Sequence, residues 1–331
     1  MLKPPRVSVI MPVYNVESFV AEAVQSVLNQ TFQDFELLIV DDGGSDNSLA
    51  ICEAFSDPRI SIIKQRNLGL AGARNTGIAR ARGDYVALLD SDDRWNPKKL
   101  ALHVIHLDAN RDVGVSYCGS RFIDQYGNLL RQRQSPKLSD ITSEDILCRN
   151  PVGNGSAAVI RKSVLDIASF PHPADPMRRC YFDEAFRQSE DIELWIRLAL
   201  SFNCKFEGIA PALTEYRIVA AGLSANIVRQ FESWQKMMDK AASYAREFTD
   251  RHGAIARAFQ LRYLARRAVQ MGDGSFAISL LRQSVAAAPA ILWREPKKTL
   301  TTLFAAYVLR FLGPKLAVRL AKRWTGAEVM A

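Results

Sequence analysis

The sequence predicts an α/β fold, with a mainly parallel sheet and flanking helices, followed by an all-α C-terminal extension. Up to about residue 90, short apolar runs rich in β-branched residues alternate with stretches of helical periodicity. Polar side chains gather where those runs end, and the last hundred residues are helical in composition and rich in arginine. Alternation of this kind is typical of βαβ crossovers, which build parallel sheets with helices on both faces.

The first predicted element is a strand over Val7–Val13, a nearly continuous apolar run that suits burial on both faces. A helix follows, because apolar side chains recur at helical spacing from Phe19 to Leu28. The alternation then repeats. The further expected elements are a strand over 36–40, a helix over 46–55, a strand over 60–64, a helix over 71–81 and a strand over 85–89.

Polar residues cluster at the ends of three predicted strands. The clusters are Pro12-Val13-Tyr14-Asn15, Asp41-Asp42-Gly43-Gly44 and Asp90-Ser91-Asp92-Asp93. Ligands of open α/β sheets bind at the carboxyl ends of the strands. The three clusters therefore predict a single cleft at that edge of the sheet.

Asp90 and Asp92 are the sharpest chemical feature. Two carboxylates separated by one residue at a strand end offer the hard oxygen ligands that Mg²⁺ or Mn²⁺ prefers against a diphosphate. Such a cation would neutralise charge that develops on a leaving nucleoside diphosphate; a capped turn is the structural alternative. The carboxylates of Asp41 and Asp42 repel each other at a buried strand end unless they accept hydrogen bonds. The donors of a nucleobase or a ribose could provide these bonds. Ordinary turn chemistry is the alternative there.

Residues 67–77 place Arg74 among small residues between a predicted strand and a predicted helix. Their spacing matches neither the dinucleotide pattern G-x-G-x-x-G nor the P-loop with its Gly-Lys-Ser/Thr ending. This counts against an oxidoreductase and against an NTPase. Residues 153–156 lack the nucleophile-elbow pattern, which disfavours a hydrolase.

Residues 117–216 have a less regular pattern. We interpret them as the half of the catalytic domain that binds the second substrate, an acceptor with a reactive hydroxyl. A helix is expected over Glu190–Ser201, and its first turn carries Glu190 and Asp191. The helix dipole alone favours acids there, whereas the functional interpretation makes one of them a general base for an acceptor hydroxyl. Asn154 and Trp195 are placed on the acceptor side. The predicted catalytic domain is 1–225, divided at about 115/116 into nucleotide-binding and acceptor-binding halves.

The remaining residues, 226–331, are expected to form a basic helical extension. From Arg229 onward there are 18 Lys+Arg against 7 Asp+Glu, a net +11, which leaves −3 for the rest of a chain of net +8. Residues of about 257–289 resemble one tetratricopeptide-type helical hairpin. Residues 300–312 are apolar but too short to span a bilayer, and they are interpreted as an interfacial amphipathic segment. Beyond them lie Lys315, Arg319, Lys322, Arg323 and Trp324.

This extension predicts a peripheral contact with an anionic membrane surface and no nucleic-acid partner. Five cysteines without a C-x-x-C pair indicate reduced core residues rather than a disulfide framework or a zinc site. The N-terminus lacks an apolar signal core of adequate length. A cytoplasmic protein, peripheral on the inner face of the cell membrane, is therefore expected.

Several motifs together resemble the family 2 glycosyltransferases, which have the GT-A type of Rossmann-like fold. They are the run 7–15, Asp41-Asp42-Gly43, Ala73-Arg74-Asn75-x-Gly77, Asp90-Ser91-Asp92-Asp93, and Glu190-Asp191 with Trp195. The resemblance covers roughly residues 5–220. It implies an inverting, metal-dependent transfer from a nucleotide-diphosphate sugar, with uridine as the favoured base. The implied acceptor is a hydroxyl of a glycan or lipid-linked molecule in cell-surface polysaccharide biosynthesis.

The resemblance also implies a role for each matching position. The implied nucleotide-sugar-binding residues are Pro12, Tyr14, Asn15, Asp41, Asp42, Arg74, Asp90 and Ser91. Pro12, Tyr14 and Asp42 would border the base, and Asp90 would face the ribose. Asp92 would bind the divalent metal, Mn²⁺ or Mg²⁺. Asp191 would be the general base, with Glu190 nearby.

One departure from the family pattern is Gly44, which stands where serine is usual and changes only a secondary contact. Two alternative functions are disfavoured. A sugar nucleotidyltransferase would normally carry a Gly-rich basic loop near the N-terminus for its triphosphate, and residues 12–15 offer none. A non-catalytic adaptor is disfavoured because an idle cleft has no physical need for Asp42, Asp90, Asp92 and Asp191 together.

Overall fold

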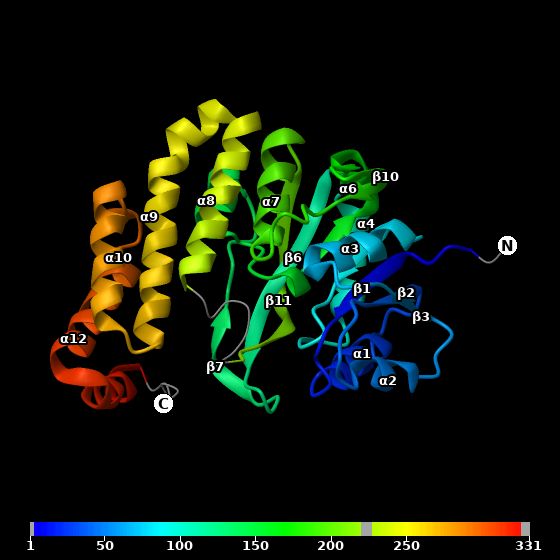
Figure 1. The fold of residues 1–331 in the computed structure, drawn as a ribbon, viewed down its shortest axis with the longest axis horizontal. Helices are drawn as coiled ribbons and strands as arrows, with labels where there is room; N and C mark the ends of the chain where they lie inside the picture. The colour runs from blue at the N-terminus through cyan, green and yellow to red at the C-terminus, as the bar shows by residue number, and fades with distance from the viewer. Residues whose placement is uncertain (1–2, 220–226, 326–331) are drawn as a thin grey trace. The chain divides into compact units, whose positions relative to one another are not determined.

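The structure is a computed structural model that describes residues 3–219 and 227–325, and only the backbone of residues 312 and 314–325. The chain separates into two compact units. The first comprises Met1–Ile146 with Asn150–Gly222, and the second comprises Leu147–Arg149 with Leu223–Ala331. The first unit is built around a large sheet, and the second consists of helices (Figure 1).

Four parallel strands begin the sheet of the first unit, side by side in the order β3-β2-β1-β4. They are β1 (Val7–Val13), β2 (Phe35–Asp41), β3 (Ile60–Lys64) and β4 (Tyr85–Leu88). The helices that connect them are α1 (Val20–Leu28), α2 (Ser48–Glu53) and α3 (Gly69–Arg80). The predicted α/β class is confirmed, and each of these strands lies within one residue of its predicted bounds.

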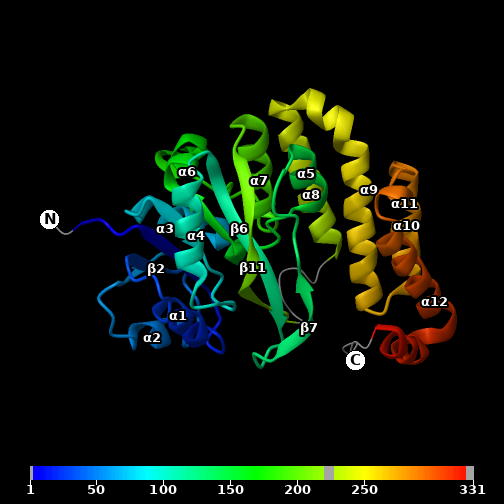
Figure 2. The ribbon, with the colours of Figure 1, turned by 180° about the vertical axis from the view of Figure 1, so that it is seen from behind.

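The sheet continues beyond β4 in the order β8-β6-β11-β5, with β7 paired to β6. These strands are β5 (Arg94–Trp95), β6 (Val113–Ile123), β7 (Leu129–Gln134), β8 (Ala158–Arg161) and β11 (Lys205–Arg217). β8 runs antiparallel to both β4 and β6, whereas β6 and β11 are parallel and run side by side in both views (Figures 1 and 2).

This second part of the sheet is continuous, although the sequence pattern there is less regular, and register shifts interrupt the pairing of β6 with β11 and with β7. β6 is buried over most of its length but mixes apolar residues with glycine and serine, including the fully buried Ser116 and Ser120. A strand of this composition has no clean period of two, which explains the difference. The remaining elements are α4 (Lys99–Ala109), α5 (Ser143–Arg149), the 3₁₀ turn η1 (Gly155–Ala157), α6 (Lys162–Ala168), β9 (Phe170–His172), β10 (Asp175–Cys180) and α7 (Glu190–Ser201).

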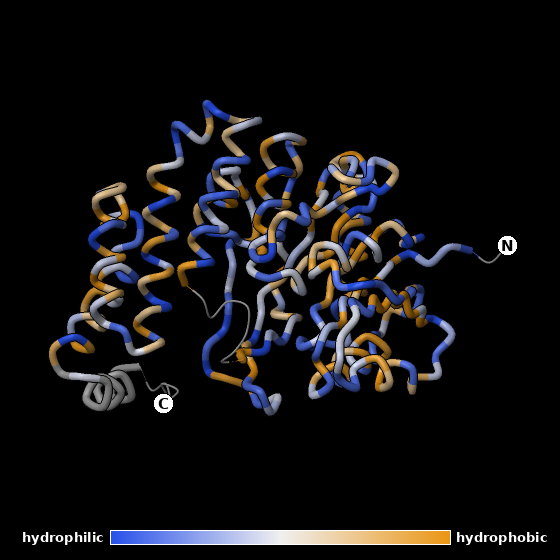
Figure 3. Tube along the Cα trace, in the orientation of Figure 1, coloured by the Kyte–Doolittle hydropathy of each residue, from blue (hydrophilic) through white to orange (hydrophobic). Residues whose placement is uncertain are grey.

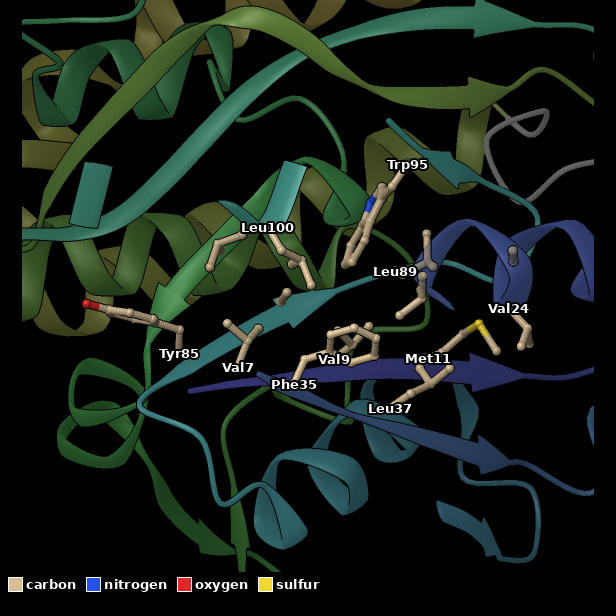
Figure 4. Close-up of a cluster of buried hydrophobic side chains, with 14 of the residues drawn as sticks. Val7, Val9, Met11, Val24, Phe35, Leu37, Tyr85, Leu89, Trp95 and Leu100 are labelled. Atoms are coloured by element: carbon tan, nitrogen blue, oxygen red, sulfur yellow. The ribbon is translucent and has the colours of Figure 1, made fainter. Parts of the chain in front are cut away.

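The two faces of β1 carry different packing. Val9 and Met11 lie on one face in an apolar core that also takes in Val24 of α1 and Leu100 of α4 (Figure 4). On the other face α3 packs so closely that a Cβ at Gly77 would lie 2.5 Å from Ile10 Cγ2. Only glycine fits at that contact, and it holds α3 against the strand.

The second unit is an array of helices. They are α8 (Ile227–Tyr244), α9 (Arg246–Gln270), α10 (Gly274–Ala287), α11 (Ile291–Arg294) and α12 (Pro296–Thr325). α9 and α10 form a hairpin in the region 257–289. Gly272, with φ of +81°, makes its turn, and the Asp273 carboxylate caps α10 by accepting from the Phe276 amide at 2.8 Å. Hydrophilic and hydrophobic residues alternate along both helices (Figure 3).

The predicted amphipathic segment 300–312 lies in α12. This helix is interrupted at Gly313, which has φ of +74° and ψ of 166°. The side chains of Lys315, Arg319, Lys322, Arg323 and Trp324 lie outside the described residues. No helix within residues 3–219 and 227–325 is both long enough and apolar enough to cross a membrane. All five cysteines are free thiols.

Candidate active site

The carboxyl ends of β1, β2 and β4 meet at one edge of the sheet, and the three predicted polar clusters follow them there. Val13 lies opposite Asp41 in the β1–β2 register, and the Asp42 amide donates to the Val13 carbonyl at 2.9 Å. On the other side of β1, the Leu89 amide donates to the Ile10 carbonyl at 3.0 Å. The register therefore brings the three clusters together.

The carboxylate of Asp42 accepts three hydrogen bonds from the chain itself. Its Oδ1 accepts from Gln65 Nε2 at 2.6 Å and from the Leu68 amide at 2.8 Å. Its Oδ2 accepts from the amide of Gly69, the first residue of α3, at 2.9 Å. Asp42 thus fixes the loop that leads into α3, and the donors expected from a ligand are already supplied at this carboxylate.

The turn after β1 presents Tyr14 and Asn15. The Tyr14 side chain is 50 % exposed, whereas Pro12 is buried within the strand. Asn15 is left-handed, with φ of 51°, and its Oδ1 accepts from the Ser45 amide at 2.8 Å. A Cβ at Gly44 would lie 3.0 Å from both the amide nitrogen and Oδ1 of Asn15. This close approach explains why glycine, and not serine, suits the position.

Arg74 of α3 is buried and forms two ion pairs. Its Nη1 lies 2.6 Å from Glu190 Oε1, and its Nη2 lies 2.6 Å from Asp90 Oδ1. Its Cζ also lies 5.2 Å from the centre of the Phe182 ring. Burial opposes the charge, but the carboxylates of Asp90, Glu190 and Asp191 raise the pKa of Arg74 above its ordinary value. A permanently charged guanidinium therefore joins the acidic loop after β4 to the start of α7.

Asp191 is the second residue of α7. Ser189, just before the helix, has φ of 60°, a conformation that non-glycine residues adopt rarely and that clusters at functional sites. Burial and repulsion from Glu190 raise the pKa of Asp191 to about 7, against the lowering effects of Arg74 and of the Ile192 amide. That amide donates to Asp191 Oδ1 at 2.8 Å. A carboxylate with a pKa near 7 is suited to accept a proton at neutral pH.

The loop after β4 crowds Asp90, Asp92 and Asp93, with Ser91 buried between them. Burial and the charge of Asp90 raise the pKa of Asp92 to about 6. Arg74 pairs with Asp90 and leaves this repulsion in place. A divalent cation would remove this repulsion, so the carboxylates fit a metal that takes its remaining ligands from a bound diphosphate. Within the described part of the chain, no three or more His, Cys, Asp or Glu side chains form a cluster that could hold one.

Two residues that the sequence did not single out hold the acidic loop. The Ser156 hydroxyl accepts from the Asp90 amide at 2.9 Å. The Arg217 amide donates to Asp93 Oδ1 at 2.9 Å, and Arg217 Nε donates to the Asp92 carbonyl at 2.7 Å. Ser156 lies in the weakly patterned section 117–216 and Arg217 directly follows it, and no sequence signal connected either residue to the loop.

A third such residue is Lys99, whose side chain is fully buried behind the acidic loop. Its Nζ donates to the Ala157 carbonyl at 3.1 Å and to Thr214 Oγ1 at 3.3 Å, and lies 5.3 Å from the centre of the Trp95 ring. Burial lowers its pKa. The signal was present in the sequence, since Lys99 and His103 occupy the apolar face of a predictable helix. A cation ties η1 to β11 at this point.

The two acceptor-side residues differ in their surroundings. Asn154 lies before η1, and its Nδ2 donates to Ser120 Oγ at 2.9 Å. Its Oδ1 is buried without a hydrogen-bond partner among the described residues. Trp195 is 0 % exposed and packs edge-on against Phe206, with ring centres 6.1 Å apart. The Trp195 ring therefore lies in the core, and its placement on the acceptor side stays a prediction.

A family model for glycosyl transferase family 2 matches residues 8–167. An uncharacterized glycosyltransferase of Methanocaldococcus jannaschii is 31 % identical over 219 residues, which are 65 % of this chain and 71 % of that protein. A UDP-Glc:alpha-D-GlcNAc-diphosphoundecaprenol beta-1,3-glucosyltransferase of Escherichia coli is 30 % identical over 235 residues, 70 % of this chain and 85 % of that protein. The chain spans about a third of the length of similar Rickettsia proteins.

The solved structures show the same fold. A mannosyltransferase from Pyrobaculum calidifontis, in complex with GDP-Man and Mn²⁺, superposes with a TM-score of 0.60 at 18 % identity, covering 98 % of this chain and 88 % of that one. The fold is thus of the GT-A type, and the curated relatives define the protein as a glycosyltransferase. By its relatives the chain belongs to glycosyl transferase family 2, which confirms the resemblance.

Proposed function

We propose that the chain transfers a sugar from a UDP-linked donor to a hydroxyl of a glycan or lipid-linked acceptor, with inversion at the anomeric carbon. The double ion pair of Arg74 carries this proposal. It joins Asp90, in the loop assigned to metal and ribose, to Glu190, the neighbour of the proposed base, with 2.6 Å on either side. Donor and acceptor chemistry would meet beside one buried guanidinium.

Asp191 is the proposed general base. With its pKa at about 7, a substantial fraction is ionised at neutral pH and able to take the proton of an acceptor hydroxyl. The hydroxyl oxygen would then attack the anomeric carbon as the bond to the diphosphate breaks, in a single in-line displacement. Glu190 stays paired to Arg74, and its charge keeps the pKa of Asp191 high.

Asp92 is proposed to hold a divalent cation, Mn²⁺ or Mg²⁺, while Asp90 faces the ribose. When bound, the cation would supply positive charge to the leaving nucleoside diphosphate. The raised pKa of Asp92 supports this assignment, because a buried acid beside another acid is stabilised by a cation. The complex of the Pyrobaculum calidifontis mannosyltransferase with Mn²⁺ supports it as well.

The nucleotide base is proposed to lie against the half-exposed ring of Tyr14, with Asn15 and Asp41 at the neighbouring strand ends. Pro12 would shape the wall from within β1. Asp42 would act through the loop that it fixes at Leu68. UDP is favoured because the Escherichia coli relative is named as a UDP-Glc enzyme.

We further propose a role in cell-surface polysaccharide biosynthesis at the inner face of the cell membrane. The Escherichia coli relative is named for a diphosphoundecaprenol-linked acceptor. In the proposed division of the chain, residues 1–115 bind the nucleotide sugar, 116–225 bind the acceptor, and the basic extension 226–331 contacts anionic lipid.

A thermal-shift measurement tests the donor site. The purified chain is heated with UDP, GDP, CDP or dTDP, with and without Mn²⁺, alongside Asp92→Ala and a control, Asp84→Ala, whose side chain is 70 % exposed. We expect UDP with Mn²⁺ to stabilise the wild type and the control by about 2–3 kcal/mol at roughly a hundredfold excess over Kd. Asp92→Ala should lose the metal-dependent part. Stabilisation by another base would correct the donor, and no shift with any nucleotide would contradict the proposal.

A further inference from the structure

Lys99 of α4 carries a charge in the interior of the first unit. Its side chain is 0 % exposed, although lysine is rarely buried completely unless it is paired. Its Nζ contacts the carbonyl of Ala157, Oγ1 of Thr214, Sγ of Cys118 at 3.2 Å and Nε2 of His103 at 3.4 Å. Within residues 3–219 and 227–325, no carboxylate forms an ion pair with Lys99. A buried cation without an anionic partner is costly, so its presence calls for a function.

The hydrogen bonds of Lys99 hold the 3₁₀ turn η1. Nζ donates directly to the Ala157 carbonyl at 3.1 Å. It also donates to Thr214 Oγ1 at 3.3 Å, and this hydroxyl donates to the Ser156 carbonyl at 3.2 Å. A hydroxyl that accepts from Nζ keeps its own proton for the carbonyl, so Lys99 orients Thr214. Two successive carbonyls of η1 are therefore fixed from the same ammonium group.

The same turn holds the acidic loop after β4, residues 90–93. The Ser156 hydroxyl accepts from the Asp90 amide at 2.9 Å, and Ser156 is fully buried. A Cβ at Gly155 would lie 2.5 Å from Arg74 Nη2 and 3.5 Å from Asp90 Oδ2. Interiors packed this closely transmit small displacements. A shift of η1 would therefore move both the Asp90 amide and the carboxylate that pairs with Arg74.

The charge of Lys99 acts on the same loop. Burial is the largest influence on the pKa of Lys99 and lowers it, whereas the contact with Cys118 and the negative charge of Asp93 oppose this lowering. Asp93 is 1 % exposed, and its Oδ2 has no hydrogen-bond partner in the part of the chain that the structure describes. The three carboxylates of the loop repel one another, and a positive charge buried behind the loop reduces that repulsion.

We propose that Lys99 is a positioning residue for the acidic loop. Through η1 it fixes the Asp90 amide, and with it the orientation of Asp90 and Asp92, the residues proposed to meet the ribose and the metal. Lys99 acts on the loop from behind and not on a substrate. The proposal rests on the proposed function for what the loop binds, whereas the path from Lys99 to the loop is independent of that function.

Hydrogen exchange of the full chain, followed by mass spectrometry of a peptide that contains residues 89–93, tests the path without any ligand. The main variant is Lys99→Met, which keeps the length of the side chain and removes its charge and donors. The control is Ser116→Ala, which removes a buried hydroxyl that contacts His103 and His106 of α4 instead of η1. We expect the peptide to exchange roughly tenfold faster in Lys99→Met, and at the wild-type rate in the control.

Binding of UDP with Mn²⁺, measured by calorimetry on the folded proteins, tests the consequence for the site. We expect Lys99→Met to raise the Kd roughly tenfold, the usual effect of losing a group that orients metal ligands. Thr214→Val, which removes the intermediate hydroxyl, should raise the Kd as well, and Ser116→Ala should bind as the wild type does. A lysine with a merely structural role would affect the melting temperature and leave the Kd of the folded protein unchanged.

Wild-type exchange of the 89–93 peptide in Lys99→Met would overturn the proposal, and so would a wild-type Kd for UDP with Mn²⁺. If Lys99→Met does not fold, Thr214→Val decides by the same two measurements, because valine has the shape of threonine without the hydroxyl. If the exchange of the loop responds but the wild type binds no nucleotide, the positioning role stands and the proposed sugar transfer falls. The two proposals therefore fail separately.

Discussion

Arg74 Nη1 lies 2.6 Å from Glu190 Oε1, although 116 residues separate the two in sequence. Arg74 belongs to α3, which packs on the parallel strands, and Glu190 begins α7. Both side chains are buried, so neither can exchange its partner for water. The pair therefore ties the nucleotide-side strands to the helix that carries the proposed base.

Replacing Arg74 with methionine should leave Asp90 and Glu190 without their counter-charge. Removing one partner of a buried ion pair typically costs about 3–5 kcal/mol. We expect urea denaturation to show a loss of that order in the free energy of unfolding, together with the loss of transfer activity. Arg80→Met, at the exposed end of the same helix, is the matched control and should change stability by less than about 0.5 kcal/mol. Equal losses in the two variants would contradict the role of the pair.

The pH dependence of activity should report Asp191. A general base works as the carboxylate, so kcat/KM is expected to rise with pH through about 7, where the pKa of Asp191 lies. Asp191→Asn should lower kcat by roughly 10²–10⁴-fold, the usual contribution of a general base. A profile that stays flat from about pH 5.5 to 8.5 would assign the proton to another group.

The raised pKa of Asp191 also makes the stability of the fold depend on pH. An aspartate whose pKa is about 7 when folded, against about 3.9 when unfolded, favours the native state when protonated. This contribution is full below about pH 4 and is lost as pH rises through about 7. Asn is neutral throughout, so Asp191→Asn should exceed the wild type in stability at about pH 8, on the order of 1–2 kcal/mol after solvent screening. Its advantage should shrink toward about pH 4.5, and an advantage independent of pH would argue against the raised pKa.

The variant Asp92→Asn should be at least as stable as the wild type without metal, and less stable than the wild type with metal and UDP. In the absence of a cation, the substitution removes a buried charge that Asp90 repels, so the variant should be at least as stable as the wild type. With Mn²⁺ and UDP the wild type should melt higher, because only it gains the bound cation. Melting curves with EDTA and with Mn²⁺ give both comparisons. A variant less stable under both conditions would indicate a structural role for this carboxylate.

Two glycine-to-alanine changes should act in opposite directions. At Gly77 the added Cβ would lie 2.5 Å from Ile10 Cγ2, so α3 must move away from β1, and we expect a loss of about 1–3 kcal/mol. At Gly253, inside α9, a Cβ would meet only Met238 Cε at 3.5 Å, and the gain in helix propensity should stabilise by about 0.5–1 kcal/mol. Chemical denaturation measures both changes. A neutral Gly77→Ala would mean that α3 is held less tightly than the structure shows.

The parallel half of the fold could be predicted from local pattern, because β1 and β2 are buried on both faces and read as continuous apolar runs. β6 could not, since its buried serines and glycines depend on neighbouring strands for their burial. In α7 the helical spacing of Trp195 was clear. Spacing alone, however, cannot tell whether an apolar helix face points to a cleft or to a core, and Phe206 decides that only in three dimensions.

The candidate site, too, could be predicted from the sequence only in part. Strand-end position was enough to bring Asp42 and Asp90 to one edge, because parallel strands share that edge by construction. The partners of these residues came from distant sequence. Ser156 and Arg217 hold the acidic loop through a hydroxyl, an amide and a guanidinium, and such contacts leave no periodicity for a sequence pattern to reveal.

The three hydrogen bonds that the chain donates to Asp42 limit how the donor specificity of the enzyme can be redesigned. Asp42 accepts a hydrogen bond from the first amide of α3, and the same helix carries Arg74 five residues later. Altering Asp42 to accept a different nucleobase would release the helix whose Arg74 pairs with Glu190, beside the proposed base, so we expect selectivity and turnover to be lost together. Tyr14 contributes a half-exposed ring, and exchanging it leaves those bonds intact. Libraries that aim at new donors should therefore diversify Tyr14 and leave Asp42 unchanged.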